Sequence, residues 1–187
     1  MVNPFEKIRS KAGDTEKSLD WYKTQVRTLS SLSPNRLMTN AVDMTTKVLP
    51  GNMYMFFYDA KHKDKLPYWD SFPLVLPFRK VPNGFYGINL HYMPYGARFK
   101  LLGMLHDYAI DEKINENTRV RVNWRILISL SRVAPIKHCV KHYLDEFVES
   151  RFLQIKYPDW VTASLLPVER FEGANKQKVW ADSRKIF

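Results

Sequence analysis

The sequence has few of the residues that build covalent or metal-centred chemistry. It contains one cysteine, Cys139, in 187 residues, so no disulfide can form within the chain and a cysteine-rich zinc site is excluded. Its 7 glycines are scattered, and neither GxGxxG nor GxxxxGK, the glycine-rich patterns that cradle phosphates, occurs. The single cysteine is typical of a protein made in a reducing compartment.

Long hydrophobic runs are also missing. No apolar stretch approaches the roughly 20 residues that span a bilayer, and the basic residues near the N-terminus are not followed by the apolar segment of a secretory signal. We therefore expect a protein made inside the cell, with no membrane partner.

What is present is typical of a folded, basic domain. Hydrophobic residues make up 45% of the chain and charged residues 26%, as in ordinary globular proteins. The net charge of +10 favours a polyanionic partner. The excess is +3 in residues 1–50, +3 in 51–110 and +4 in 111–187. An even spread steers only weakly, whereas a dedicated DNA-binding protein concentrates its charge.

The pattern divides the chain into two parts. Residues 1–50 predict a helix over 15–29, capped by Asp14, and then an extended arm outside the main core. The arm either lies along a neighbouring subunit or is a disordered leader. Residues 51–187 predict a single α+β core domain with a basic C-terminal segment.

Three strands form the clearest part of this core. Apolar runs at 53–58, 72–78 and 85–92, with the turn pair Asn83-Gly84 before the last, predict a three-stranded antiparallel meander. Several helices are expected to pack with it. Further along we predict a helix over 94–110, a strand over 119–124, an ambiguous segment over 126–133, a helix over 136–149, a strand over 151–156, a helix over 159–166 and a basic helix over 178–185.

Aromatic density indicates an interaction surface. Between Tyr54 and Phe99 lie 13 of the 26 aromatic residues, more than a small core needs. Aromatic side chains in proline-rich or terminal segments are less expected in the core, so we predict Tyr68, Trp69 and Trp180 as partner-binding residues.

Two basic clusters are candidate contacts with phosphates or with an acidic partner. The first is the loop with Lys61, Lys63 and Lys65, for which a solvated loop is the simpler interpretation. The second surrounds Phe171 and Trp180 near the C-terminus. It consists of Arg170, Lys176, Lys178, Arg184 and Lys185.

No catalytic, cofactor-binding or metal-binding residue is predicted. His138 and His142 are four apart on the expected helix, but the string HCVKH lacks the glutamate of HExxH and a third ligand. Two sets of residues only loosely match the carboxylates and lysine of a metal-dependent nuclease, the enzyme class that comes nearest to this sequence. They are Asp70 with Arg79 and Lys80, and Glu169 and Glu172 with Lys176. The protein is therefore expected not to be an enzyme.

The strings MYMFFYDAKHKDKLPYWDSFPLVLPF, GFYGINLHYMP, LLPVERFE and KVWADSRK resemble a family of small virion-associated proteins of large contractile-tailed bacteriophages, loosely labelled as virion or DNA-end-protecting proteins. The resemblance covers about residues 50–187. It implies a structural part of a phage particle or a factor acting on packaged DNA. We expect the first, a virion component in the baseplate, neck or head–tail region that is assembled in the host cytoplasm. Docking onto other virion proteins is the expected mode of action. The alternative is a nucleic-acid-binding or DNA-end-protecting or processing protein.

Overall fold

The computed structural model describes residues 3–13, 15, 17–29, 32–39, 43–107 and 115–184. A six-stranded sheet forms its centre, and every pairing in it is antiparallel. Its strands, in spatial order, are β1 (Met44–Thr45), β7 (Phe152–Ile155), β2 (Met53–Met55), β4 (Leu74–Val81), β5 (Gly84–Asn89) and β6 (Val140–Leu144). Two short strands, β3 (Trp69–Asp70) and β8 (Phe171–Glu172), pair separately. The expected α+β class is confirmed, and the three expected strands correspond to β2, β4 and β5 within this larger sheet.

The hairpin between β4 and β5 follows from its turn residues. Val81 pairs with Gly84, which leaves Pro82 and Asn83 as the loop, and Asn83 has a φ of 62°. Asparagine tolerates this left-handed conformation better than most residues. Gly84, the first residue of β5, is required because a Cβ there would collide with the carbonyl oxygen of Tyr143 on β6.

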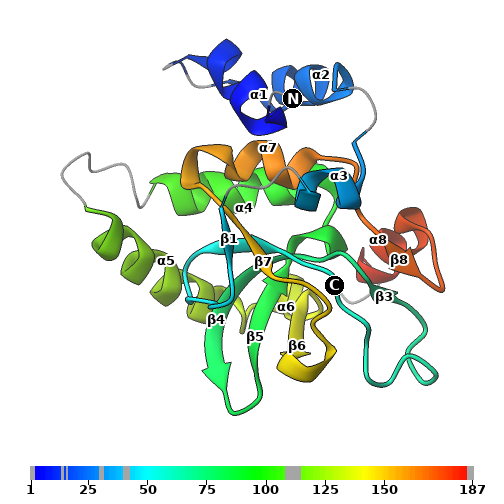
Figure 1. Ribbon diagram of the computed structural model, residues 1–187. Helices are drawn as coiled ribbons and strands as arrows, with labels where there is room; N and C mark the ends of the chain where they lie inside the picture. Colours follow the sequence, from blue (N-terminus) through cyan, green and yellow to red (C-terminus); the bar gives the residue numbers. More distant parts are fainter. Residues whose placement is uncertain are drawn as a thin grey trace.

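Helices cover one face of the sheet (Figure 1). The helices α4 (Tyr95–Asp107) and α7 (Trp160–Leu165) pack on each other, and α5 (Glu116–Leu130) packs along β4. The first two helices, α1 (Pro4–Ala12) and α2 (Leu19–Arg27), lie on the outer side of α7. The remaining elements are α3 (Pro34–Thr39), η1 (Leu90–Tyr92), α6 (Ala134–Lys137), η2 (Asp145–Phe147), η3 (Tyr157–Asp159) and α8 (Lys176–Arg184). No helix in the described ranges is long and apolar enough to cross a membrane.

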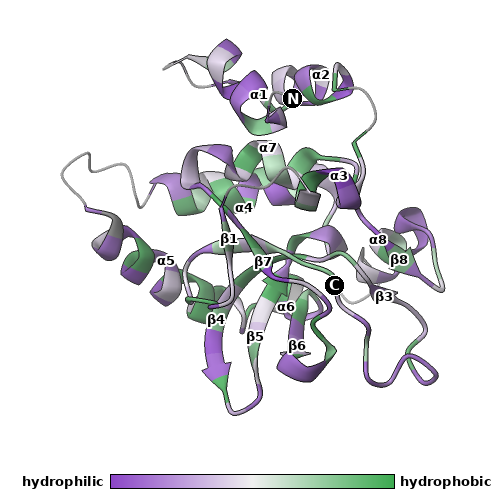
Figure 2. Ribbon diagram, in the orientation of Figure 1, coloured by the Kyte–Doolittle hydropathy of each residue, from purple (hydrophilic) through white to green (hydrophobic). Residues whose placement is uncertain are grey.

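Buried residues form two clusters, one on each face of the sheet. In Figure 2 the strands carry both green and purple segments, and the free end of β4, where exposed residues lie, is purple. The helix-covered cluster includes Leu76 and Ile88 from the strands and Leu105 from α4. The opposite cluster is largely aromatic, and its members include Tyr54, Phe56, Phe85, Tyr143 and Phe152. Phe56 lies at its centre, in edge contacts at 4.9 to 5.9 Å with three other rings. Much of the aromatic density that suggested a surface is therefore core.

The N-terminal segment differs from the extended arm that the sequence predicted. Its described residues form three helices and the strand β1, and Phe5, Ile8, Val26 and Leu37 belong to the main buried cluster. The helix predicted over 15–29 begins at Leu19 and is capped by Ser18, whose side chain accepts the Trp21 N–H at 3.2 Å. Asp14, the expected cap, lies outside the described residues.

Two predictions in the middle of the chain are wrong. The expected strand over 119–124 and the ambiguous segment after it form the single helix α5, which Asn115 caps by accepting the Thr118 N–H at 3.0 Å. The expected helix over 136–149 is instead the end of α6, the edge strand β6 and the short turn η2, and β6 pairs with β5 at five positions. Tertiary pairing outweighed local helical spacing here, because strand geometry buries Tyr143 in the aromatic cluster.

Candidate nucleic-acid interface

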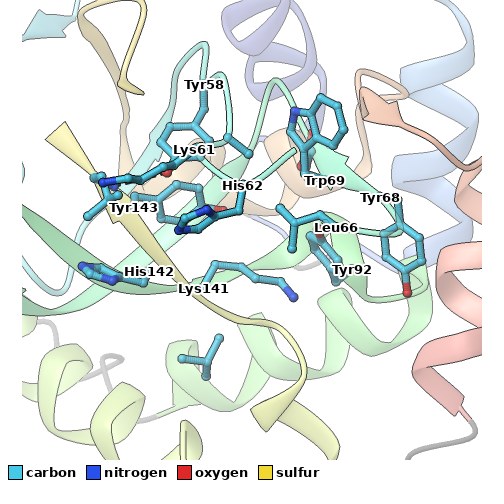
Figure 3. Close-up of a pocket in the computed structure, with 14 residues that line it drawn as sticks. Tyr58, Lys61, His62, Leu66, Tyr68, Trp69, Tyr92, Lys141, His142 and Tyr143 are labelled. Carbon is cyan, nitrogen blue, oxygen red and sulfur yellow. Dashed lines mark hydrogen bonds between the residues drawn. The ribbon is translucent and has the colours of Figure 1, made fainter. Parts of the chain in front are cut away.

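A pocket of about 490 Å³ lies between the loop 58–70 and the edge strand β6 (Figure 3). That volume is within the range of small-ligand sites. Five aromatic side chains line it, and two lysines and two histidines add positive or titratable groups. The aromatic residues are Tyr58, Tyr68, Trp69, Tyr92 and Tyr143, and the basic ones are Lys61, His62, Lys141 and His142.

The aromatic walls are held in place by their hydroxyl groups. Tyr58 and Tyr143 meet edge to face at 5.0 Å. The Tyr58 hydroxyl accepts the Leu144 N–H at 3.3 Å, and the Tyr143 hydroxyl accepts from Nδ2 of Asn89 at 3.0 Å. Burial raises the pKa of both tyrosines, so both hydroxyls stay neutral at physiological pH. Tyr58 and Tyr143 therefore form a fixed, uncharged part of the pocket wall.

Lys141 is an unusual cation within this aromatic setting. It projects from β6, and its Nζ lies 4.0 Å from the centre of the Tyr92 ring. Burial lowers the pKa of Lys141, and within the described ranges its Nζ has no acidic ion-pair partner. A cation–π contact only partly offsets the lost hydration of an ammonium. Lys141 is thus the group in the pocket that would gain most from an anionic ligand.

A buried polar network supports the back of the pocket. Asp70 Oδ2 lies 2.8 Å from His91 Nδ1 and accepts from Asn89 Nδ2 at 3.0 Å. Asp70 Oδ1 accepts the backbone N–H of Phe72 at 3.1 Å and that of Arg170 at 3.4 Å. With both oxygens satisfied, Asp70 is a structural carboxylate that fixes the pocket wall, and it has little capacity left to neutralise Lys141.

A second network lies beside the first and locks α8 to the core. The buried Arg98 guanidinium lies 2.8 Å from Glu169 and donates to the carbonyl oxygens of Met93 and Ser164, each at 2.7 Å. Burial alone would raise the pKa of Glu169, but interactions with His91, Arg98 and Lys176 outweigh it and lower that pKa. The carboxylate therefore stays ionised and pairs with Arg98.

The structure brings together some of the predicted partner-binding residues. Tyr68 and Trp69 are half-buried and line the pocket with Lys61. Trp180 lies elsewhere: its Nε1 donates to the His91 carbonyl oxygen at 2.8 Å, and its ring packs against Tyr95 on α4. In this structure Trp180 anchors α8.

The lysine loop is largely neutralised by local acids. Lys61 Nζ lies 3.6 Å from Glu146, and Lys63 Nζ lies 2.7 Å from Asp59. Lys65 is exposed and has no ion pair in the part of the chain that the structure describes. The three lysines are thus not equivalent, as only Lys61 lines the pocket.

The basic C-terminal residues are similarly divided. Lys176 lies 3.7 Å from Glu169 and donates to the Tyr95 hydroxyl at 3.2 Å, while Lys178 pairs with Asp182 at 3.2 Å. Arg170 is exposed. Of the other two predicted contacts, Arg184 is the last residue of α8, and Lys185 lies outside the described residues.

A further set of cations lies on and after α5. Arg121, Arg125 and Arg132 are exposed, and none forms an ion pair within the described ranges. Arg121 and Arg125 are one helical turn apart, about 6 Å along the axis, so they share a face. The sequence did not predict this face, because Arg125 fell between the strand expected over 119–124 and the ambiguous segment over 126–133.

Lys141 and His142 were not among the candidate residues, again because the secondary structure predicted for their segment was wrong. With 136–149 predicted as a helix, His138 and His142 shared a face and Lys141 did not stand out. In the structure His138 Nε2 lies 3.0 Å from Cys139 Sγ, whereas His142 stacks on Tyr86 at 4.5 Å. Val140 and Tyr143, residue types favoured in strands, were the available signal for β6.

Aromatic walls combined with cations that lack acidic partners are the features with which proteins bind nucleic-acid strands. The family model of the Phage T4 terminal DNA protecting protein matches residues 3–185, so the chain belongs to that family. No curated protein and no solved structure matches the chain.

This membership corrects the main functional expectation. A structural component of a contractile-tailed phage virion, in the baseplate, neck or head–tail region, was expected from the sequence. That prediction is wrong because the family is one of DNA protection. The resemblance to a phage protein family is confirmed only at that coarser level. The match also includes the first 50 residues, which the resemblance did not cover.

Proposed function

We propose that this protein binds the ends of linear duplex DNA and shields them. The observation that carries the proposal is the family match across residues 3–185, from the first helix to the last. The net charge of +10 supports it, because cationic side chains release counterions when they bind phosphates. DNA is therefore the proposed partner in place of other virion proteins.

The exposed face of α5 is the proposed contact with the duplex backbone. Arg121 and Arg125 project from one face of this helix, and Arg132 follows it in the turn before α6. Arginine forms bidentate contacts with phosphates. Such contacts fix position on the duplex without reading sequence, as a protein that accepts any DNA end requires.

Shielding requires binding and no bond-making step. A protein seated on a strand terminus excludes an exonuclease from the scissile bond for as long as it stays bound, so the dissociation rate determines the protection. This mechanism needs neither a metal nor a nucleophile. Shielding of the ends also requires that the protein bind DNA ends more tightly than the interior of the duplex.

The test compares a linear duplex with the same sequence as a covalently closed circle. We expect the protein to slow exonuclease digestion of the linear duplex, and the circle to compete poorly for the protein at equal nucleotide concentration. Equal competition by the circle would show that binding does not depend on ends and would contradict the proposal.

A further inference from the structure

We propose that the pocket between loop 58–70 and β6 holds one unpaired terminal nucleotide of a DNA strand, with its base against the aromatic walls and its phosphate at Lys141. This inference rests on the proposed function and deepens it, since it assigns the part of the DNA end that is recognised.

The position of Lys141 in the pocket suits a phosphate group of the ligand. The Nζ of Lys141 contacts the Tyr92 ring at 4.0 Å and forms no ion pair within the described ranges. The carboxylate that lines the same pocket, Asp70, already accepts four hydrogen bonds from His91, Asn89 and two backbone N–H groups. Lys141 therefore stands in an apolar wall without a counter-charge, and a phosphate oxygen would supply both a charge and an acceptor.

The aromatic side chains that line the pocket suit a nucleic-acid base. Tyr68 and Trp69 are half-buried on one side of the pocket, and Tyr143 lies on the other, from β6 (Figure 3). Base–aromatic stacking accepts every base, because each has a π face.

The size of the pocket argues for one nucleotide at a terminus. A volume of about 490 Å³ suits a drug-sized ligand, whereas an intact base pair with its two backbones is far larger. A base must therefore leave the stack to enter. Extruding a base costs least where it is already poorly paired, and at a duplex end this requires no distortion of the helix interior. The pocket thereby accounts for a preference for ends.

The experiment measures dissociation constants by fluorescence anisotropy for hairpin duplexes with one free end. One hairpin ends in normal nucleotides, and its partner carries an abasic site at the terminal position of each strand. We expect removal of the bases to weaken binding roughly tenfold, in line with the stacking of one base. A free deoxynucleoside 5′-monophosphate should compete for the pocket better than the nucleoside or inorganic phosphate alone.

Matched lysine variants locate the effect. Lys141→Met keeps the length of the side chain and removes its charge, so we expect it to weaken end binding roughly tenfold and to abolish competition by the monophosphate. Lys7→Met removes an exposed lysine from α1, outside the pocket, and should change affinity less than about twofold. A terminal 2-aminopurine, read by its own fluorescence on the wild-type protein, tests base extrusion without any variant.

Two results would overturn the inference while leaving end protection intact. One is equal affinity for normal and abasic ends, with no change in the 2-aminopurine signal. The other is a folded Lys141→Met protein that binds ends as tightly as Lys7→Met. Failure of the linear duplex to outcompete the circle would instead contradict the proposed function itself.

Discussion

Asp70 Oδ2 lies 2.8 Å from Nδ1 of His91, and both side chains are buried. Asp70 ends β3, and His91 lies in η1 directly after β5. This contact therefore joins the small two-stranded sheet to the large one, and it fixes the wall of the pocket from which Trp69 projects.

Asp70→Asn is expected to lower the free energy of unfolding by about 1–3 kcal/mol. The carboxylate accepts hydrogen bonds on both oxygens, so either orientation of the amide places an NH₂ group against another donor. Urea unfolding measures the loss. Asp64→Asn, in the exposed loop, is the control and should change stability by less than about 0.5 kcal/mol. Equal stability of the two variants would contradict the role of Asp70.

Glu169→Gln is expected to destabilise the protein near neutral pH by about 3–5 kcal/mol, because it leaves the Arg98 guanidinium buried without its charge partner. The folded state lowers the pKa of Glu169 below its ordinary value of 4.5. Its contribution to stability is therefore present above that value and is lost as the pH falls through the lower folded pKa.

The free energy of unfolding of the wild type and of Glu169→Gln, measured across this acid range, tests whether the contribution of Glu169 is lost as the pH falls. The difference in stability between the two should shrink as the pH falls below 4.5. Glu149→Gln, an exposed carboxylate, controls for general acid effects. A difference that stays constant or grows at low pH would show that Glu169 is not stabilised in its ionised form.

Ile8→Ala tests whether the first helix belongs to the core. Ile8 is 1% exposed and lies in the main buried cluster, so its truncation should cost about 2–5 kcal/mol in unfolding free energy. Lys7→Ala, on the exposed side of the same helix, should cost almost nothing. If both variants unfold like the wild type, α1 does not contribute to the cooperative unit.

Gly84→Ala should loosen the edge strand. A methyl group at this position would meet the carbonyl oxygen of Tyr143, which forces β5 and β6 apart and shifts Lys141 and Tyr143 in the pocket. We expect lower thermal stability together with weaker binding to DNA ends. Gly103→Ala in α4 has open space around the new methyl group and should stabilise the helix by about 0.5–1 kcal/mol. If a folded Gly84→Ala protein binds DNA ends as tightly as the wild type, β6 does not take part in end binding.

The double variant Arg121→Gln/Arg125→Gln tests the proposed duplex contact. If each arginine neutralises one phosphate, the slope of log affinity against log salt should flatten by about 1.8, or about 0.9 per contact. Lys7→Gln, an exposed cation on α1, should leave the slope unchanged. An unaltered slope in the double variant would place the duplex on another face.

Local signals in the sequence were sufficient where a segment needs only its neighbours. Asn83-Gly84 predicted the hairpin, and the apolar runs predicted β2, β4 and β5. Pro94, which is suited to the first turn of a helix, begins the segment 94–110 that was expected to be helical and that contains α4. The hairpin and the helix start depend on the backbone preferences of one or two residues. The strands were recognisable because they are buried on both faces and are therefore continuously apolar. The α+β class followed from these elements.

Local signals failed where the partner of a segment is distant in sequence. The residues 140–144 have helical spacing, yet they form β6 because β5 offers five paired positions and the aromatic cluster takes Tyr143. Phe5 and Ile8 are ordinary apolar residues in a polar segment, and only the surface of α7 and η3 makes them core.

The sequence by itself determined the class of fold, the basic charge, the hairpin and the candidate residues Tyr68 and Trp69. Only the tertiary structure decided which cations have counter-charges, because ion pairs such as Lys61 with Glu146 join residues far apart in the chain. It also placed Lys141 opposite the loop 58–70, across a strand pairing that the sequence did not predict. The pocket depends on that pairing, since burial and charge compensation are properties of three-dimensional neighbours.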